Sequence, residues 1–258
     1  QIADQSTRGS GPQILSNYVT QAVDRVDMLY KQKEPITGVA TGFVDLDETQ
    51  NNTSKGNKND FYLPRVKWLP DSQQVSYQWQ SRDQKTLKLQ TYHIKKRKNK
   101  TLLTEHSDHW LNLHKDLYFL SDNKSFIWAS ERDGFKHLYH FTNQGKLINQ
   151  LTKGNWVVDT IEHIDEKNGL IYFTGRADTP LERHLYRVPL NGKSPEHVAR
   201  ISKRNGFHSI SFSKDSQTYL DSFSNISTPP QVSLHQADGK HITWLSENKV
   251  TKEHNVNR

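Results

Sequence analysis

The sequence predicts an all-β fold, a β-propeller of four-stranded antiparallel blades, with about four blades and part of another in this chain. Three observations lead to this prediction. Similar phrases recur at a spacing of roughly 45 to 50 residues, the period of a four-stranded blade. Segments between turns alternate polar and apolar residues and are rich in β-branched and aromatic side chains. Only 33% of the residues are hydrophobic, yet 6 Trp, 10 Tyr and 10 Phe are present, which suits half-exposed strands anchored by aromatic rings.

The repeated phrase is a strand, a polar turn and a second strand. It is clearest in residues 74–89, 125–139 and 169–186. The second and third copies both end in His-Leu-Tyr. After the second copy, the chain continues through Gly145 and an outer strand to Thr152, and the unit restarts at Trp156. Each period therefore accounts for four strands.

We expect the blades, in chain order, at residues 62–104, 110–152, 156–202 and 207–245, with residues 36–48 as the last strands of an earlier blade. Pro, Gly, Asn and Asp mark the reversals, because they restrict φ or tolerate a positive φ. The expected turns are Pro70-Asp71, Asn191-Gly192, Thr228-Pro229-Pro230 and Asp238-Gly239. Residues 1–17 are predicted to be a flexible N-terminal segment, and residues 18–258 the partial propeller domain. Since an unclosed propeller leaves strand edges exposed, we expect this sequence to be part of a longer chain.

Composition excludes several function classes. The 258 residues contain no cysteine, so a disulfide, a cysteine nucleophile and a thiolate-based zinc site are excluded. No apolar run approaches the roughly 18 to 20 residues of a membrane helix. The net charge is +7, and its most basic run is residues 95–100, Lys-Lys-Arg-Lys-Asn-Lys. Strand-like segments flank this run and no stacking aromatics accompany it, so we interpret it as a solvated hairpin turn and expect no nucleic-acid partner.

The sequence contains no complete catalytic or metal-binding motif. No G-x-S-x-G pentapeptide occurs, so the chain has no nucleophile elbow. His208 and Ser209 are neighbours in a predicted strand, where adjacent side chains point to opposite faces, and we expect no catalytic pair there. Gly192-Lys193-Ser194 lacks the first glycine of a phosphate-binding loop and is predicted to be a hairpin turn. His106, His109 and His114 lack a carboxylate or cysteine partner, so we predict no metal site.

An ordered set of phrases resembles one family. Three of its longest members are Asp60-Phe-Tyr-Leu-Pro-Arg-Val-Lys-Trp-Leu-Pro-Asp71, Ser130-Glu-Arg-Asp-Gly134 before His-Leu-Tyr, and Leu151-Thr-Lys-Gly-Asn-Trp156. Together they resemble the N-terminal propeller region of the dipeptidyl peptidase IV branch of the prolyl oligopeptidase family of serine peptidases. The resemblance extends over roughly residues 18–248. It implies an eight-bladed propeller that covers an α/β-hydrolase domain, with the two together removing dipeptides from peptide amino termini, commonly after Pro or Ala.

The resemblance also implies partners and limits. It implies peptide substrates, a hydrolase domain on the same polypeptide, a homodimer in many members, and no cofactor. Bacterial members are often exported, which would place the protein in the periplasm, outside the cell or at a membrane. Two family features are missing, because the chain has neither the nucleophile elbow nor the paired glutamates that bind the substrate's amino group. The chain alone is therefore expected to be non-catalytic, with substrate gating and recognition as its role.

The residues that correspond to a substrate-contacting loop of the family lie after the first predicted blade. They are Trp110, His114 and Lys115, the nearest matches to an aromatic and a basic residue of that loop. An ordinary strand start explains this segment as well. Arg82, Arg132 and Arg176 stand at equivalent positions of successive blades, and we interpret them as ties between neighbouring blades rather than substrate ligands.

A second class of function stays open. Propellers host many unrelated activities, so the chain is alternatively a non-catalytic module that binds protein or carbohydrate. Residues 130–135, Ser-Glu-Arg-Asp-Gly-Phe, partly match the Asp-box pattern of sialidases. A hydrolase sequence after Arg258 would favour the peptidase interpretation over the binding module.

Overall fold

The computed structural model describes residues 61–192 and 197–249, and these residues form β-strands joined by turns and loops, without an α-helix. A boundary between two compact units falls after Phe61, and the sheets described below belong to the second unit, Tyr62–Arg258, apart from the first residue of the first strand. Residues 1–17 and 36–48 of the predictions lie outside the described residues. Within the described part of the chain, no helix has the length and apolar character needed to cross a membrane.

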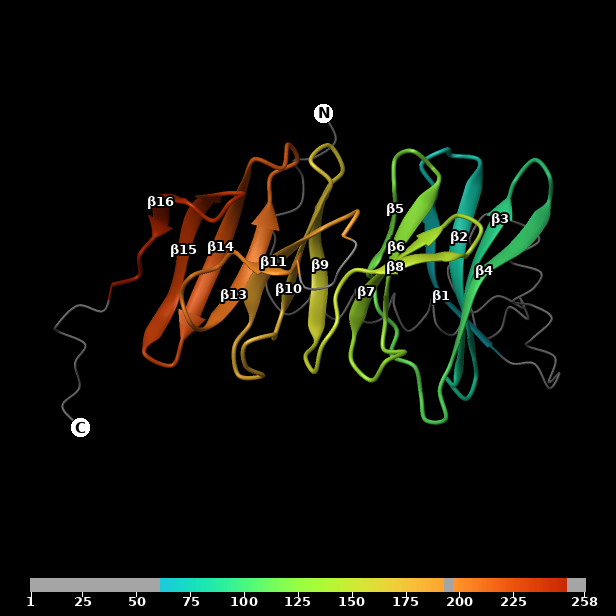
Figure 1. Cartoon of the computed structure of the whole chain (residues 1–258), viewed down its shortest axis with the longest axis horizontal. Helices are drawn as coiled ribbons and strands as arrows, with labels where there is room; N and C mark the ends of the chain where they lie inside the picture. The colour runs from blue at the N-terminus through green and yellow to red at the C-terminus, as the bar shows by residue number, and fades with distance from the viewer. Residues whose placement is uncertain (1–60, 193–196, 250–258) are drawn as a thin grey trace, which may run out of the picture. The chain divides into compact units, whose positions relative to one another are not determined.

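Four sheets of four strands each follow one another along the chain (Figure 1). The first contains β1 (Phe61–Trp68), β2 (Gln74–Ser81), β3 (Thr86–His93) and β4 (Lys98–His106). The second contains β5 (Leu117–Phe119), β6 (Ser125–Ser130), β7 (His137–Thr142) and β8 (Leu147–Gln150). The third contains β9 (Val158–Asp165), β10 (Leu170–Gly175), β11 (His184–Pro189) and β12 (Ala199–Arg200). The fourth contains β13 (Phe207–Phe212), β14 (Thr218–Asn225), β15 (Thr228–Gln236) and β16 (His241–Ser246).

Each strand pairs with the next strand in sequence, which makes every sheet an antiparallel meander, the blade of a propeller. The prediction of an incomplete all-β propeller is confirmed. The four expected blades coincide with the four sheets, apart from the start of the second. Residues 110–116 form no strand, and β5 begins only at Leu117. Trp110 is 62% exposed and contributes nothing to a strand face, which explains why the expected strand start is wrong.

The core lies between successive sheets. Alternate residues are buried along β3 and β14, as period-two side-chain alternation requires, whereas every residue of β6 is buried. The first core cluster joins the first two sheets through residues such as Leu89 and Trp128, the second joins the next two through Ile127 and Phe173, and the third joins the last two. Trp128 has no exposed surface and is the largest buried side chain. The blades therefore depend on one another for their burial.

The repeated histidines are structural clamps. His137 contacts Thr152 Oγ1 through Nδ1 (3.0 Å) and the carbonyl oxygen of Gly154 through Nε2 (2.9 Å). Thr152 Oγ1 also accepts the N–H of Leu138. The third sheet repeats this, with His184 bonded to Ser202 Oγ at 3.1 Å. Each clamp joins the third strand of a blade to the loop that leads to the next blade, so the His-Leu-Tyr phrase has a packing role.

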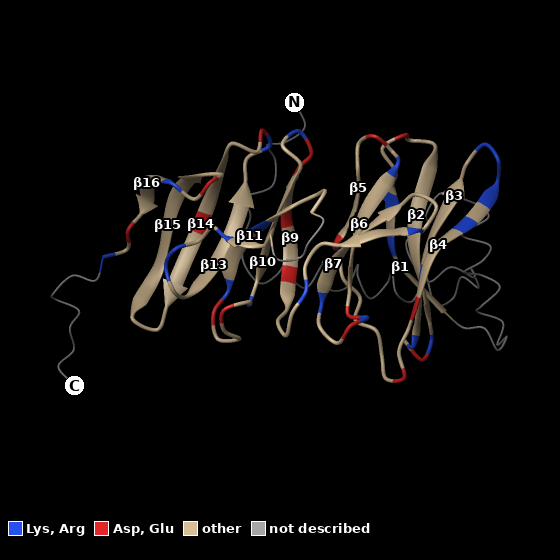
Figure 2. Ribbon diagram, in the orientation of Figure 1, with Lys and Arg blue, Asp and Glu red and all other residues tan. Residues whose placement is uncertain are grey.

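Two turn predictions need comment. The basic run does form a hairpin, but the turn is only residues 94–97, and Lys98 to Lys100 belong to β4 (Figure 2). The prediction of a turn at Thr228-Pro229-Pro230 is wrong, because the turn is Ile226-Ser227 and both prolines lie in β15. The register shifts at this point, from Phe223 paired with Gln231 to Asn225 paired with Thr228. The prolines fall inside this bulge, where a missing N–H costs no ladder hydrogen bond.

Candidate functional site

The loop of residues 107–116 carries the predicted substrate-contacting residues and connects the first blade to the second. It lies against the β2–β3 turn, because Leu111 N donates to Gln84 O at 2.8 Å and Ser107 N donates to Lys85 O at 2.9 Å. Gln80 Nε2 adds a bond to Leu111 O at 2.9 Å. These bonds fix the loop without regular secondary structure.

The structure separates the three predicted residues. Trp110 and Lys115 are exposed, whereas His114 is turned toward the interior. The His114 ring meets the Trp128 ring edge-on, with centroids 4.5 Å apart. Trp110 and Lys115 are thus available to a ligand, while His114 fixes the loop between them.

The environment of His114 keeps its ring neutral. Both ring nitrogens are shielded from solvent and have no hydrogen-bond partner among the described residues. Burial lowers the pKa of His114 to about 4, although the nearby Asp116 carboxylate acts in the opposite direction. A neutral imidazole without a partner does not act as a charged ligand-binding group at neutral pH.

Lys115 lines a cavity of about 370 Å³ between the first two blades. Two further cations from β1, Arg65 and Lys67, line the same cavity. Lys67 Nζ donates to Leu117 O at 3.1 Å, and burial lowers the pKa of this amine. Gln78 contributes a shielded amide oxygen without a partner. The cavity therefore offers cations for oxygen atoms of a ligand and one acceptor for an N–H group.

Asp116 anchors the end of this loop, and sequence reasoning did not identify it. Its carboxylate pairs with Lys136 Nζ at 2.6 Å and accepts Thr160 Oγ1 at 2.8 Å and the Ile161 N–H at 2.9 Å. Burial alone would raise the pKa of Asp116, but the Lys136 charge and these hydrogen bonds outweigh burial and lower it. A lone Asp in a loop gives no sequence signal for contacts 44 and 45 residues away.

The three equivalent arginines differ in what they contact. Arg132 forms an ion pair with Glu105 of the first blade at 2.7 Å, so it ties neighbouring blades as expected. Arg176 pairs with Asp159 of its own blade, and its guanidinium lies 5.2 Å from the ring centre of Phe207 in the next blade. Arg82 instead lies over Tyr62 of its own blade, at 4.8 Å.

The remaining sequence candidates have ordinary structural contacts. His208 is buried against Asp221, and Ser209, the next residue of β13, is exposed. His106 Nδ1 lies 3.3 Å from Thr86 Oγ1, and His109 is exposed. Among the described residues, no group of three His, Cys, Asp or Glu side chains is arranged to hold a metal ion. Gly192 N closes a turn onto Pro189 O at 3.0 Å, while Lys193 and Ser194 lie outside the described residues.

Blades of four antiparallel strands that follow one another along the chain define a segment of a β-propeller, with a cationic cavity between its first two blades. Comparison with known families makes this specific. The family model "Dipeptidyl peptidase IV (DPP IV) N-terminal region" matches residues 29–230, and the chain belongs to this family.

Curated relatives and a solved structure agree with this membership. The chain is 26% identical over 209 residues to "Probable dipeptidyl-aminopeptidase B" of Pyrenophora tritici-repentis, covering 74% of this chain and 23% of that protein. It is 31% identical over 164 residues to dipeptidyl peptidase 8 of Mus musculus, covering 51% and 18%. The crystal structure of Porphyromonas gingivalis dipeptidyl peptidase 4 superposes with a TM-score of 0.69 at 25% identity, over 75% of this chain and 27% of that one. The chain thus spans less than a third of the length of these relatives.

Proposed function

We propose that this chain is the substrate-gating and substrate-recognition part of the propeller of a serine-type dipeptidyl aminopeptidase, which releases N-terminal dipeptides, often after Pro or Ala. The cationic cavity of Arg65, Lys67 and Lys115 carries the proposal. A peptide exposes a carbonyl oxygen at each residue and a carboxylate at its end, and these are the groups that ammonium and guanidinium ions bind. The reactive serine belongs to a hydrolase domain outside this sequence.

The role of the chain in this proposal is positioning and exclusion. Lys115 holds a peptide oxygen by a charge-assisted hydrogen bond, and Trp110, an earlier residue of the same loop, offers an exposed apolar surface. Because such contacts fix the peptide before the bond is cut, they contribute through proximity and orientation rather than through bond chemistry. The stacked blades keep folded proteins away from the site by steric exclusion.

The test is dipeptide release by the complete protein with Lys115 replaced. Lys115→Ala removes one exposed cation of the cavity, and we expect KM to rise several-fold, up to about tenfold for roughly 1.4 kcal/mol of lost binding, with kcat little changed. Lys124→Ala is the matched control, since Lys124 is also exposed but lies in the β5–β6 turn and does not line the cavity.

An unchanged KM in Lys115→Ala would contradict the assignment of this cavity. A complete protein that releases no dipeptide from any peptide with a free amino terminus would contradict the peptidase assignment itself. That second outcome would leave the alternative of a propeller that binds protein or carbohydrate.

A further inference from the structure

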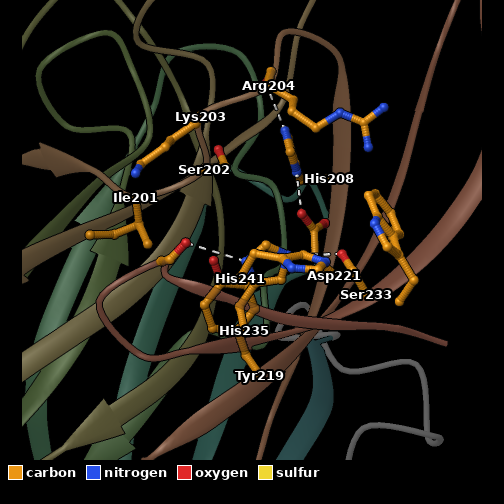
Figure 3. A pocket seen from close by; sticks show the side chains of 12 residues that line it. Ile201, Ser202, Lys203, Arg204, His208, Tyr219, Asp221, Ser233, His235 and His241 are labelled. Carbon is orange, nitrogen blue, oxygen red and sulfur yellow. Dashed lines mark hydrogen bonds and ion pairs between the residues drawn. The ribbon is translucent and has the colours of Figure 1, made fainter.

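A second cavity, of about 300 Å³, lies between the third and fourth blades (Figure 3). Its walls come from the loop after β12 and from the face of β13 to β16 that is turned toward the third blade. Its volume is at the lower end of the range for small-molecule sites, roughly 300 to 1,000 Å³. It shares no lining residue with the cavity around Lys115.

Aromatic rings form one side of this cavity. The rings of Tyr219 and His235 lie parallel, 5.1 Å apart. His241 meets His235 edge-on at 5.3 Å, and Trp244 lies 5.0 Å from His241. Burial lowers the pKa of His235, so this ring is neutral at pH 7. Neutral aromatic rings of this kind form apolar walls and also attract cations through their faces.

A buried carboxylate faces the rings. Asp221 Oδ2 lies 2.8 Å from His208 Nδ1, while His208 Nε2 lies 2.9 Å from the carbonyl oxygen of Arg204. Since a carbonyl oxygen only accepts, His208 Nε2 must donate. Asp221 Oδ1 is buried and has no hydrogen-bond partner within residues 61–192 and 197–249. Burying a carboxylate oxygen without a donor costs desolvation free energy, and a ligand in the adjacent cavity could supply the missing donor.

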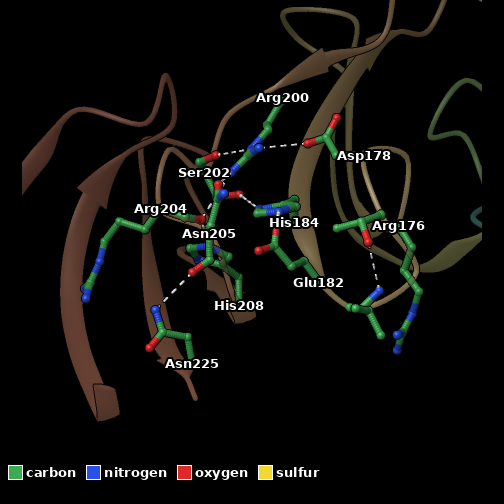
Figure 4. A network of polar contacts seen from close by, with 12 residues as sticks. Arg176, Asp178, Glu182, His184, Arg200, Ser202, Arg204, Asn205, His208 and Asn225 are labelled. Carbon is green, nitrogen blue, oxygen red and sulfur yellow. Dashed lines mark hydrogen bonds and ion pairs between the residues drawn. The ribbon is translucent and has the colours of Figure 1, made fainter. Parts of the chain in front are cut away.

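Two cations complete the lining of the cavity, and both come from one loop. Lys203 and Arg204 line the cavity from the loop after β12. Arg200 fixes that loop, because its guanidinium donates to Ser202 O at 2.7 Å and to Arg204 O at 3.1 Å while pairing with Asp178 at 2.8 Å (Figure 4). The Arg204 guanidinium lies over the Phe223 ring at 3.6 Å. The cavity is thus lined both by a carboxylate oxygen without a donor and by two cations.

The third blade shows that the polar floor departs from the repeat. Phe173 and Tyr186 are partners across β10 and β11, three residues after the start of β10, and both are buried against the second blade. Three residues after the start of β14, the corresponding partners are Asp221 and Ser233. Replacing two core aromatic residues by a carboxylate and a hydroxyl lowers apolar burial, and such local departures from a repeated packing pattern are typical of binding sites.

We propose that this cavity binds a zwitterion of amino-acid or dipeptide size. The ammonium group of the ligand donates to Asp221 Oδ1, its carboxylate pairs with Arg204 and Lys203, and its side chain packs on the aromatic rings. A ligand that carries only a positive charge is disfavoured, because the Lys203 and Arg204 charges line the same cavity. A ligand that carries only a negative charge is disfavoured by the carboxylate oxygen Asp221 Oδ1.

The experiment is calorimetric titration of the complete protein with four probes. L-leucine and glycyl-L-leucine carry both charges, L-leucinamide keeps only the ammonium group, and N-acetyl-L-leucine keeps only the carboxylate. We expect one or both zwitterions to bind, and each single-charge probe to bind at least about tenfold more weakly, a loss of roughly 1.4 kcal/mol or more. The zwitterion that binds more tightly identifies the source, a free amino acid or a dipeptide.

Variants locate the binding. Trp244→Ala and Lys203→Ala should each weaken zwitterion binding several-fold. Leu245→Ala and Lys214→Ala are the matched controls, because Leu245 and Lys214 are exposed and do not line the cavity, and these variants should leave binding unchanged. Lys115→Ala should also leave it unchanged, which separates this site from the proposed peptide site. Absence of binding by both zwitterions at millimolar concentration, equal binding of a single-charge probe, or unchanged binding in Trp244→Ala and Lys203→Ala would each overturn the proposal.

Discussion

Replacing His114 should remove a large part of the acid sensitivity of the first two blades. The pKa of this side chain falls from 6.5 in the unfolded chain to about 4 in the fold, because burial beside Trp128 disfavours the charged ring. As the pH falls below 6.5, the unfolded chain binds a proton that the folded chain does not. The stabilisation is therefore fully present above pH 6.5 and is lost as the pH falls toward 4.

The magnitude follows from the difference in pKa. A shift of about 2.5 units corresponds to roughly 3 kcal/mol at about 1.4 kcal/mol per unit. His114→Leu removes the titrating ring and fills a similar volume, and it also removes two shielded nitrogens without partners. At pH 7 we expect the free energy of unfolding to change by about 1 kcal/mol or less, since lost ring contact and relieved burial of polar atoms offset each other.

The assay is urea unfolding followed by tryptophan fluorescence at a series of pH values between 7 and 4. The variant should gain roughly 3 kcal/mol relative to the unsubstituted protein across this interval, because all other titrating groups are common to both. His109→Leu, at an exposed position of the same loop, is the control and should show no such gain. Parallel pH profiles for His114→Leu and the unsubstituted protein would refute the reasoning.

Two further substitutions test how the blades are joined. Gly145 has a φ of 85°, and a Cβ at this position would overlap the carbonyl of Leu102 in the first blade. Gly134 also has a positive φ, but its surroundings are open. Gly145→Ala should therefore lower the free energy of unfolding by about 2 kcal/mol more than Gly134→Ala. Equal urea midpoints for the two variants would contradict this. Asp116→Asn leaves the half-buried Lys136 without its partner and should cost about 3 kcal/mol at pH 7, a difference that should shrink as the pH falls below 3.8, where the unfolded carboxyl protonates. A pH-independent difference would show that the charge of Asp116 is not what matters.

Much of the fold followed from the period of the sequence. The copies at 125–139 and 169–186 predict strand pairs because alternation and turn residues agree with the same register in both. The errors arise where one local signal conflicts with a bulge or a loop. Pro229 and Pro230 favour a turn by propensity, yet the bulge in β15 absorbs both residues within a strand. Trp110 resembles the aromatic start of a strand, yet its ring lies outside the core.

The candidate site was only partly predictable. Lys115 was identified through a resemblance, but Arg65 and Lys67 share its cavity because β1 of one blade lies beside the start of the next, which depends on how two sheets pack. Sequence separation hides this, since Lys67 and the carbonyl of Leu117 are 50 residues apart. His114 shows the opposite limit, because a histidine in a polar loop gives no sign that both ring nitrogens are shielded.

The loops between blades differ in how their side chains fill the space at the junctions. At the junction of the second and third blades, Trp156 stacks on Phe173 and meets His137 edge-on, so an aromatic side chain fills the space beside the loop. In the next loop, Ile201-Ser202-Lys203-Arg204-Asn205-Gly206 corresponds to Leu151-Thr-Lys-Gly-Asn-Trp156, and a glycine stands where that Trp stood. The clamp between the loop and the preceding strand is kept in both, through Thr152 and Ser202. Because the clamp fixes the backbone while the loop side chains vary, the same blade geometry gives a filled core at one junction and a ligand-sized cavity at the next.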